Sequence, residues 1–112
     1  MKKNNLVFIK HIRDAIIRIN NFTLNHTKSK FLKDELVQSA VIRQIEIIGE
    51  ASKNLSLSFR NKHSQIPFKD IAGMRDKLIH HYFGVDINSV WNTVKSDLPK
   101  LENQINQILK NN

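Results

Sequence analysis

The sequence predicts an all-α protein, an antiparallel bundle of four to five helices in a single domain over residues 1–112. Only three glycines and two prolines interrupt the chain, whereas an all-β domain requires many more turn residues. Apolar residues recur every three or four positions along most of the chain, which is the periodicity of amphipathic helices. The length suits one hydrophobic core, and no repeat, low-complexity tract or linker marks a second domain.

Two helices are expected in the first half of the chain. The first covers about 4–25, and its apolar stripe contains Phe8, Ile12, Ala15, Ile16, Ile19 and Phe22. The second covers about 32–60, and its stripe contains Val37, Val41, Ile45, Ile48, Ser52, Leu55 and Phe59. Ile42 and Ile47 widen this second stripe, so the helix has two faces to bury, one of them against a second copy of the chain.

Shorter elements are expected after residue 60. Pro67 can occupy the first position of a helical turn at 68–72. Gly73 is expected to separate that turn from a second helix at 74–83, which Gly84 would end as a left-handed C-cap.

A final helix is expected to begin at Asp86, whose side chain can serve as the N-cap. Its helical register is maintained by Val90, Val94, Leu98, Leu101, Ile105 and Ile108. Pro99 has no backbone N–H, so it should kink this helix or split it, with Asp97 as a second cap. Trp91 lies in the same helix and is expected in the core rather than on a base-stacking surface.

The charge balance favours an anionic partner, with nucleic acid first among the candidates. The 18 Lys and Arg exceed the 10 Asp and Glu, which gives a formal net charge of +8 at pH 7. The lysines are spread over every segment, which indicates salt-sensitive attraction that is independent of base sequence. The absence of cysteine excludes a disulfide scaffold, a Cys-ligated metal and a thiol nucleophile. With neither a signal-peptide core nor an apolar run of roughly 20 residues, we expect a cytoplasmic protein with no membrane association.

The densest polar segment of the chain is RDKLIHHY at 75–82. On a helix Asp76 and His80 lie about 40° apart around the axis, so the carboxylate can accept a hydrogen bond from the imidazole and raise its basicity. Arg75 and Tyr82 are seven residues apart and share a face. Arg75 and His80, in contrast, lie about 140° apart and cannot converge within one straight helix.

A symmetric dimer would bring these two groups together, because Arg75 of one chain could approach His80 of the other across a twofold axis. Such a cleft suits RNA cleavage without a metal. One imidazole takes the 2′-hydroxyl proton, another group protonates the leaving 5′ oxygen, and arginine stabilises the charged phosphorane. The same residues also fit a structural role, with Arg75 in a surface ion pair, His80 in an internal hydrogen bond and Tyr82 in the core.

Other polar residues are weaker candidates. His81 suggests a metal ligand, but adjacent helix positions point about 100° apart and no HExxH pattern is present, so neither a metal nor another cofactor is expected. The isolated histidines that should be solvated are His11, His26 and His63. Close helix packing explains Gly49. The candidates for a contact in the cleft or at the dimer interface are Glu50, Lys77 and His81.

Four segments carry a resemblance to a known family. They are IIGEA at 47–51, IPFKDIAGM at 66–74, RDKLIHHYF at 75–83 and VDINSVW at 85–91. In this order they resemble the HepT-like family of the HEPN superfamily, and the likeness covers essentially the whole chain. Departures are small, since many relatives have Trp at the position of Phe68 and Asn at that of Asp76.

This resemblance implies an all-α HEPN bundle that forms a homodimer and acts as the metal-independent endoribonuclease toxin of a type VII toxin–antitoxin system. The family motif is Arg, four residues, His, one residue, Tyr. It implies that Arg75 and His80 are the catalytic pair, with Asp76 at the polar position after the arginine. It also implies that an MntA-like minimal nucleotidyltransferase antitoxin uses ATP to adenylylate Tyr82. The added AMP would block the cleft by its charge and bulk.

Two other interpretations stay open at this point. The first is a non-catalytic HEPN subunit that binds nucleotide or substrate for a partner nucleotidyltransferase, with Arg75 and His80 only holding phosphate. The second is a helical dimer that uses the motif for packing alone. Cleavage of RNA by the isolated chain distinguishes the ribonuclease from both, and nucleotide binding without cleavage favours the non-catalytic subunit.

Overall fold

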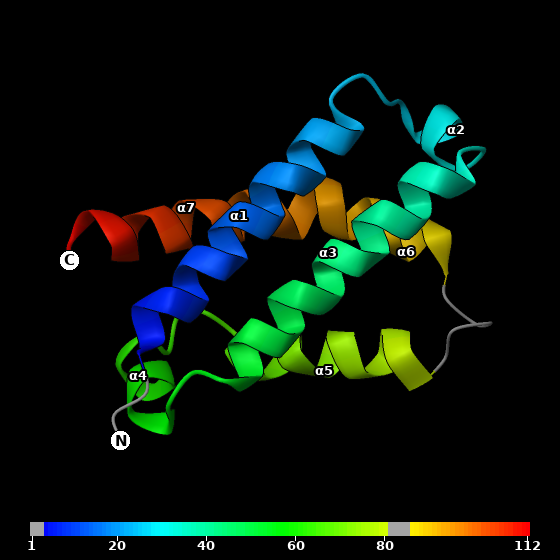
Figure 1. Ribbon diagram of the computed structural model, residues 1–112. Helices are drawn as coiled ribbons and strands as arrows, with labels where there is room; N and C mark the ends of the chain where they lie inside the picture. The colour runs from blue at the N-terminus through cyan, green and yellow to red at the C-terminus, as the bar shows by residue number, and fades with distance from the viewer. Residues whose placement is uncertain (1–3, 81–85) are drawn as a thin grey trace.

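Every regular element in the described part of the chain is helical (Figure 1). The computed structural model describes residues 4–80 and 86–112, apart from the side chains of 77–80, and this part contains no strand. The all-α prediction is therefore confirmed. The elements are α1 (Asn5–Thr23), α2 (Lys28–Phe31), α3 (Glu35–Lys53), α4 (Leu57–Lys62), α5 (Phe68–His80), α6 (Ile87–Asn92), the π-helical segment η2 (Thr93–Asp97) and α7 (Leu98–Lys110). None of these described helices is long and apolar enough to span a bilayer.

The long helices pack around one core. Helices α1 and α3 run antiparallel and side by side, α5 packs against α3, and α7 packs against α1 (Figure 1). Because each helix carries an apolar stripe, the stripes meet between the helices. Core residues at most 1% exposed include Ile12, Ile16, Ile45, Ile48 and Ile105. These were expected in the stripes, whereas Phe22 is 37% exposed and lies outside the core.

Side-chain caps define the starts of α2 and α3. The Asp34 carboxylate accepts a hydrogen bond from the backbone N–H of Val37 at 3.1 Å, as an N-cap does, and its other oxygen lies 3.1 Å from the His26 ring. The Thr27 hydroxyl caps α2 by accepting from the N–H of Lys30 at 3.2 Å. Helix α2 is an element that the periodicity did not predict.

The expected single helix over 32–60 is wrong, because α3 ends at Lys53 and α4 begins at Leu57. Asn54 forms the C-cap of α3, and its backbone N–H bonds back to the carbonyls of the last turn. The hydroxyl of Ser56 then accepts from the N–H of Phe59 at 3.2 Å and starts α4. Hydrogen bonds between two small polar residues, Asn54 and Ser56, and the backbone therefore end α3 and start α4.

Helix α5 is continuous from Phe68 to His80, so the expected break at Gly73 is wrong. Gly73 does not have a positive φ angle, and it therefore extends the helix like any other residue. Pro67 directly precedes the helix, and its carbonyl accepts from the N–H of Ile71 at 3.0 Å. The expected cap at Gly84 lies outside the described residues.

The last helical rod begins at its predicted cap. Asp86 accepts from the N–H of Asn88 at 3.0 Å and from the hydroxyl of Ser89 at 3.1 Å. The π-helical segment η2 then separates α6 from α7 just before Pro99, which confirms the expected split. Asp97 makes no side-chain capping bond there, so its prediction as a second cap is wrong. It lies in helical backbone conformation itself, whereas an N-cap residue has an extended one.

Candidate active site

Arg75 lies at a close contact of α5 with α3. Gly49 of α3 faces it, and a Cβ placed on Gly49 would overlap the Cβ of Arg75 and lie 2.8 Å from its Cγ. No larger residue fits at position 49 unless one of the helices moves, because packed interiors leave no such space. The packing role expected for Gly49 is therefore confirmed, and the stem of Arg75 lies directly against α3.

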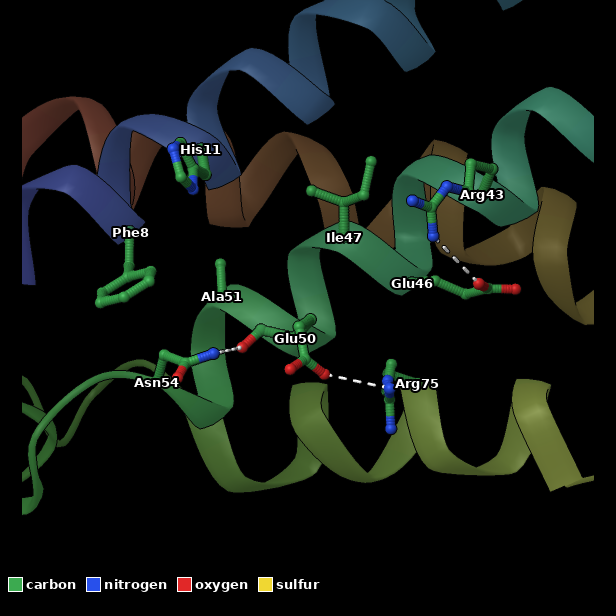
Figure 2. A pocket seen from close by; sticks show the side chains of 9 residues that line it. All are labelled: Phe8, His11, Arg43, Glu46, Ile47, Glu50, Ala51, Asn54 and Arg75. Atoms are coloured by element: carbon green, nitrogen blue, oxygen red, sulfur yellow. Dashed lines mark hydrogen bonds and ion pairs between the residues drawn. The ribbon is translucent and has the colours of Figure 1, made fainter.

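Four charged side chains surround this contact, two from α3 and two from α5. The Arg75 Nη2 lies 3.0 Å from Oε2 of Glu50, an ion pair that bridges the two helices (Figure 2). The Arg75 Nη1 donates to Oδ1 of Asp76 at 3.0 Å. The same Oδ1 accepts from Nζ of Lys53 at 3.2 Å. These residues, Glu50, Lys53, Arg75 and Asp76, are referred to below as the Arg75 network.

The Arg75 network keeps Asp76 ionised. Hydrogen bonds from Arg75 and then from Lys53 hold the pKa of Asp76 below its ordinary value of 3.8. The side chain of Arg75 is 25% exposed and that of Glu50 is 55% exposed, so the guanidinium is the more confined partner of this ion pair. An exposed ion pair contributes little free energy. Little free energy therefore holds the exposed Glu50 carboxylate at Arg75.

A cavity of about 240 Å³ opens beside Arg75 (Figure 2). Its walls come from α1, α3 and α5. The lining residues are Phe8, His11, Arg43, Glu46, Ile47, Glu50, Ala51, Asn54 and Arg75. Two guanidinium groups line the cavity and each is paired with a carboxylate of α3, Arg43 with Glu46 and Arg75 with Glu50, so the lining is polar and balanced in charge.

The structure brings together Arg75, Asp76 and Glu50 among the residues that the sequence singled out. The other singled-out residues are His81 and Tyr82, which lie outside the described residues, and Lys77 and His80, whose side chains do. Position 80 is the last residue of α5, so the backbone places it on the same helix as Arg75. The predicted contact of Asp76 with the His80 imidazole is not tested.

Lys53 is the member of the Arg75 network that the sequence reasoning missed. It follows Glu50 by three positions on α3, so the two residues lie on neighbouring parts of one helix face. The spacing was available in the sequence. Only the packing of α5 on α3, however, shows that Lys53 meets Asp76.

The three isolated histidines have different surroundings. His11 is exposed, as expected. His26 bonds to Asp34 at 3.1 Å, and His63 packs on Phe59 with ring centroids 4.6 Å apart, so the prediction that both are solvated is wrong. Burial lowers the pKa of His63. Among the side chains of 4–76 and 86–112, no three from His, Asp or Glu cluster closely enough to hold a metal ion.

Trp91 has the structural role that its place in the last helix predicted. Its side chain is 7% exposed, and its ring centroid lies 5.0 Å from that of Phe31. Lys95 covers the ring with its ammonium group 4.7 Å from the centroid. The indole is therefore part of the core and is not available to stack on a base.

The fold and the site together define an all-α bundle that holds an arginine, a residue suited to phosphate, on the wall of an open cavity. A family model described as ribonuclease HepT-like matches residues 12–108 of the chain. The protein belongs to the HepT-like ribonuclease family, and the resemblance found in the sequence is confirmed. The all-α bundle is accordingly a HEPN bundle.

Curated relatives agree with this assignment. A protein named "probable ribonuclease HepT" from Thermococcus cleftensis is 46% identical over 110 residues, which are 98% of this chain and 100% of the relative. A Methanocaldococcus jannaschii protein named "gamma-glutamylcyclotransferase and putative RNase" is also 46% identical over 110 residues, 98% of this chain. The match spans only 50% of that second relative. No solved structure matches the chain significantly.

Proposed function

We propose that this protein is a metal-independent endoribonuclease and the toxin of a toxin–antitoxin pair, acting as a homodimer in the cytoplasm. The observation that carries the proposal is Arg75 on the wall of a polar cavity in a member of the HepT-like ribonuclease family. The net charge of +8 draws RNA to the protein. A phosphate of that RNA then replaces Glu50 at Arg75, because guanidinium binds phosphate and carboxylate with the same forked geometry.

In the proposed reaction His80 acts as general acid or base and Arg75 stabilises the reacting phosphate. An imidazole removes the 2′-hydroxyl proton, the 2′ oxygen bonds to phosphorus, and the 5′ oxygen leaves with a proton from a second group. General acid–base catalysis of this kind contributes about 10² to 10⁴ in rate. Asp76 orients His80 in this proposal, since Arg75 and Lys53 both use its Oδ1, and its Oδ2 bonds to no described side chain and can serve an imidazole four residues further on.

A homodimer would bring Arg75 and His80 together, which a single copy of α5 cannot do. In continuous α5, positions 75 and 80 lie about 140° apart around the axis. We therefore propose that Arg75 of one copy and His80 of the other share a cleft. Helix α3 offers a surface for this contact, because Leu36 lies outside its buried stripe and is 81% exposed.

Tyr82 is the proposed target of an MntA-like nucleotidyltransferase antitoxin, which would transfer AMP to its hydroxyl from ATP. A bulky anion two positions beyond His80 would repel the substrate phosphate and obstruct the cleft. Tyr82→Phe removes the acceptor oxygen and little else. Incubated with antitoxin and ATP, this variant should gain no AMP mass, and a gain would place the modification on another residue.

One observation favours a second candidate function. The Arg75 network pairs two cations with two carboxylates, as expected for an arginine that holds charge without taking part in a reaction. The chain would then be a non-catalytic HEPN subunit that presents nucleotide to a minimal nucleotidyltransferase. This candidate predicts binding of nucleotide by the purified protein without cleavage of RNA.

Mapping new ends in total RNA distinguishes these functions. Purified wild-type protein and His80→Ala are incubated with RNA in the presence of EDTA. The ribonuclease proposal predicts new ends with the wild-type protein alone. Arg75→Ala, tested in the same way, should also give no new ends. Its matched control is Arg18→Ala, which removes an exposed positive charge from α1 and should still cleave. Full activity of a folded His80→Ala protein would end the catalytic assignment.

A further inference from the structure

The cavity beside Arg75 contains an aromatic pair that the proposed reaction does not use. Phe8 and His11 of α1 line it together with Arg75 of α5 (Figure 2). Their rings meet edge to face, with centroids 6.0 Å apart and planes at 88°. Two perpendicular rings form a corner in which a third flat ring can lie face-on to one ring and edge-on to the other.

We propose that this cavity is a nucleobase subsite, which holds the base of the nucleotide whose phosphate contacts Arg75. The phosphate contact with Arg75 rests on the proposed function. The new element is the binding of the base that belongs to the same nucleotide. Phe8 and His11 provide the stacking surface. Stacking on aromatic rings accepts every base, so this subsite strengthens binding of single-stranded RNA without requiring one sequence.

The volume of the cavity fits a base better than a larger ligand. It measures about 240 Å³, below the roughly 300–1,000 Å³ of pockets that enclose drug-sized molecules. One ring system fits in this space, while the sugar and phosphate of the same nucleotide stay outside. Arg75 of α5 lines the same cavity as the α1 pair, so the proposal places the phosphate of this nucleotide at its guanidinium.

Asn54 gives the cavity a polar edge. Its side-chain amide donates to the backbone carbonyl of Glu50 at 2.9 Å, which anchors the side chain on the last turn of α3. The anchored amide keeps its Oδ1 as an acceptor for an amino or imino hydrogen of a base. Because this acceptor is held in place before a ligand arrives, the contact requires little further ordering.

The aromatic pair is more than a consequence of core packing. Phe8 is half-buried against the core, but His11 is exposed, so the imidazole is not needed to fill the interior. A second pair of the same composition, Phe59 and His63, lies outside this cavity with centroids 4.6 Å apart. It provides a matched control for the loss of one histidine ring.

The test measures binding of two small probes that differ only in the base, adenosine 5′-monophosphate and ribose 5-phosphate, by chemical-shift titration of the wild-type protein. Wild type should bind the nucleotide roughly 5- to 150-fold more tightly, the range for one stacked base. In the double variant Phe8→Leu, His11→Ala this ratio should fall at least about five-fold, the smallest loss expected for one stacked base, with the affinity for ribose 5-phosphate unchanged. Leucine keeps an apolar side chain against the core, so the variant should fold.

Two further variants make the result specific. Arg75→Ala should weaken both probes alike, because it removes the phosphate contact and leaves the stacking corner. His63→Ala should keep the wild-type ratio of the affinity for adenosine 5′-monophosphate to that for ribose 5-phosphate. A ratio near one in the wild-type protein, or a wild-type ratio in the double variant, overturns the subsite. Cleavage of RNA is measured on the same preparations. If the protein prefers the nucleotide over ribose 5-phosphate but does not cleave RNA, only the proposed function is contradicted. If it cleaves RNA without this preference, only the subsite is contradicted.

Discussion

Gly49 and Arg75 lie so close across the contact of α3 with α5 that a Cβ on residue 49 would sit 3.3 Å from the Cα of Arg75 and overlap its Cβ. The next residue on α3, Glu50, meets the Arg75 guanidinium at 3.0 Å. Two consecutive residues of one helix therefore position both ends of the arginine. The spacing between α3 and α5 at this contact therefore sets the position of the Arg75 side chain in the candidate site.

Gly49→Ala should destabilise the protein and reduce RNA cleavage. The added methyl group has no space, and overpacking of this kind costs about 1–3 kcal/mol of unfolding free energy. The helices must move apart, which displaces Arg75 from the cavity. Urea unfolding followed by the fluorescence of Trp91, the one tryptophan of the chain, measures the first effect, and initial cleavage rates measure the second.

Gly73→Ala is the matched control on α5. Apart from its two chain neighbours and the nearby backbone of α5, no described atom lies within 4 Å of a Cβ added there, so the expected effect is the gain in helix propensity, about 0.5–1 kcal/mol. This variant should be more stable than wild type and should cleave RNA normally. If alanine is tolerated at 49 as well as at 73, the close contact does not constrain the site.

Asp76→Asn should retain cleavage. Asparagine has a single amide oxygen, which can accept from the imidazole that Asp76 is proposed to orient, while the bonds that Arg75 and Lys53 now donate to Oδ1 are given up. Asp76→Ala removes the acceptor and should lose most of the activity, which cleavage rates of the two folded variants will show. Loss of cleavage in the asparagine variant would demonstrate that the negative charge itself is required, contrary to an acceptor role.

Glu50→Gln should bind RNA more tightly than the wild-type protein, because it removes the carboxylate that competes with phosphate for Arg75. The expected gain is up to about five-fold, since exposed ion pairs contribute at most about 1 kcal/mol. Fluorescence anisotropy with a labelled oligoribonucleotide, in a His80→Ala background, measures it without cleavage. Glu46→Gln is the control, because Glu46 lines the same cavity but pairs with Arg43. Weaker binding by Glu50→Gln would rule out competition.

The N-cap of α3, Asp34, should make the free energy of unfolding depend on pH in the acidic range. A hydrogen bond with the His26 side chain, followed by one from the backbone N–H of Val37, lowers the pKa of Asp34 below 3.8 in the folded protein. A lowered pKa means that the stabilisation is complete above pH 3.8 and is lost as the pH falls through the folded-state value. The stability difference between wild type and Asp34→Ala should therefore shrink on acidification, as measured by urea unfolding across this range. A constant difference would contradict the role of the ionised carboxylate.

Local signals in the sequence predicted most of the helices. The apolar stripes placed Ile12 and Ile45 in the core, and Asp86 was recognised as a cap because its partners follow it directly. The break after Lys53 was missed because the apolar spacing continues through it, while the bonds of Asn54 and Ser56 end one helix and start another. A break was wrongly expected at the glycine of α5, since glycine permits a turn but does not impose one.

The candidate site was predictable only in part, for a physical reason. Arg75 and Asp76 are neighbours in sequence, so their contact follows from one local segment. Glu50 and Lys53 come from α3, and their contacts depend on how closely two helices approach, which the spacing within each helix does not determine. Phe8 joins the cavity from a third helix for the same reason.

Complementation between two inactive variants tests most directly whether two copies build each active site. Arg75→Ala and His80→Ala are mixed in equal amounts, and native mass spectrometry verifies that mixed dimers form. If each site takes residue 75 from one copy and residue 80 from the other, a mixed dimer keeps one intact site, and the mixture should recover about a quarter of the wild-type cleavage rate. A mixture that contains mixed dimers and cleaves RNA no faster than either variant alone would contradict the shared site.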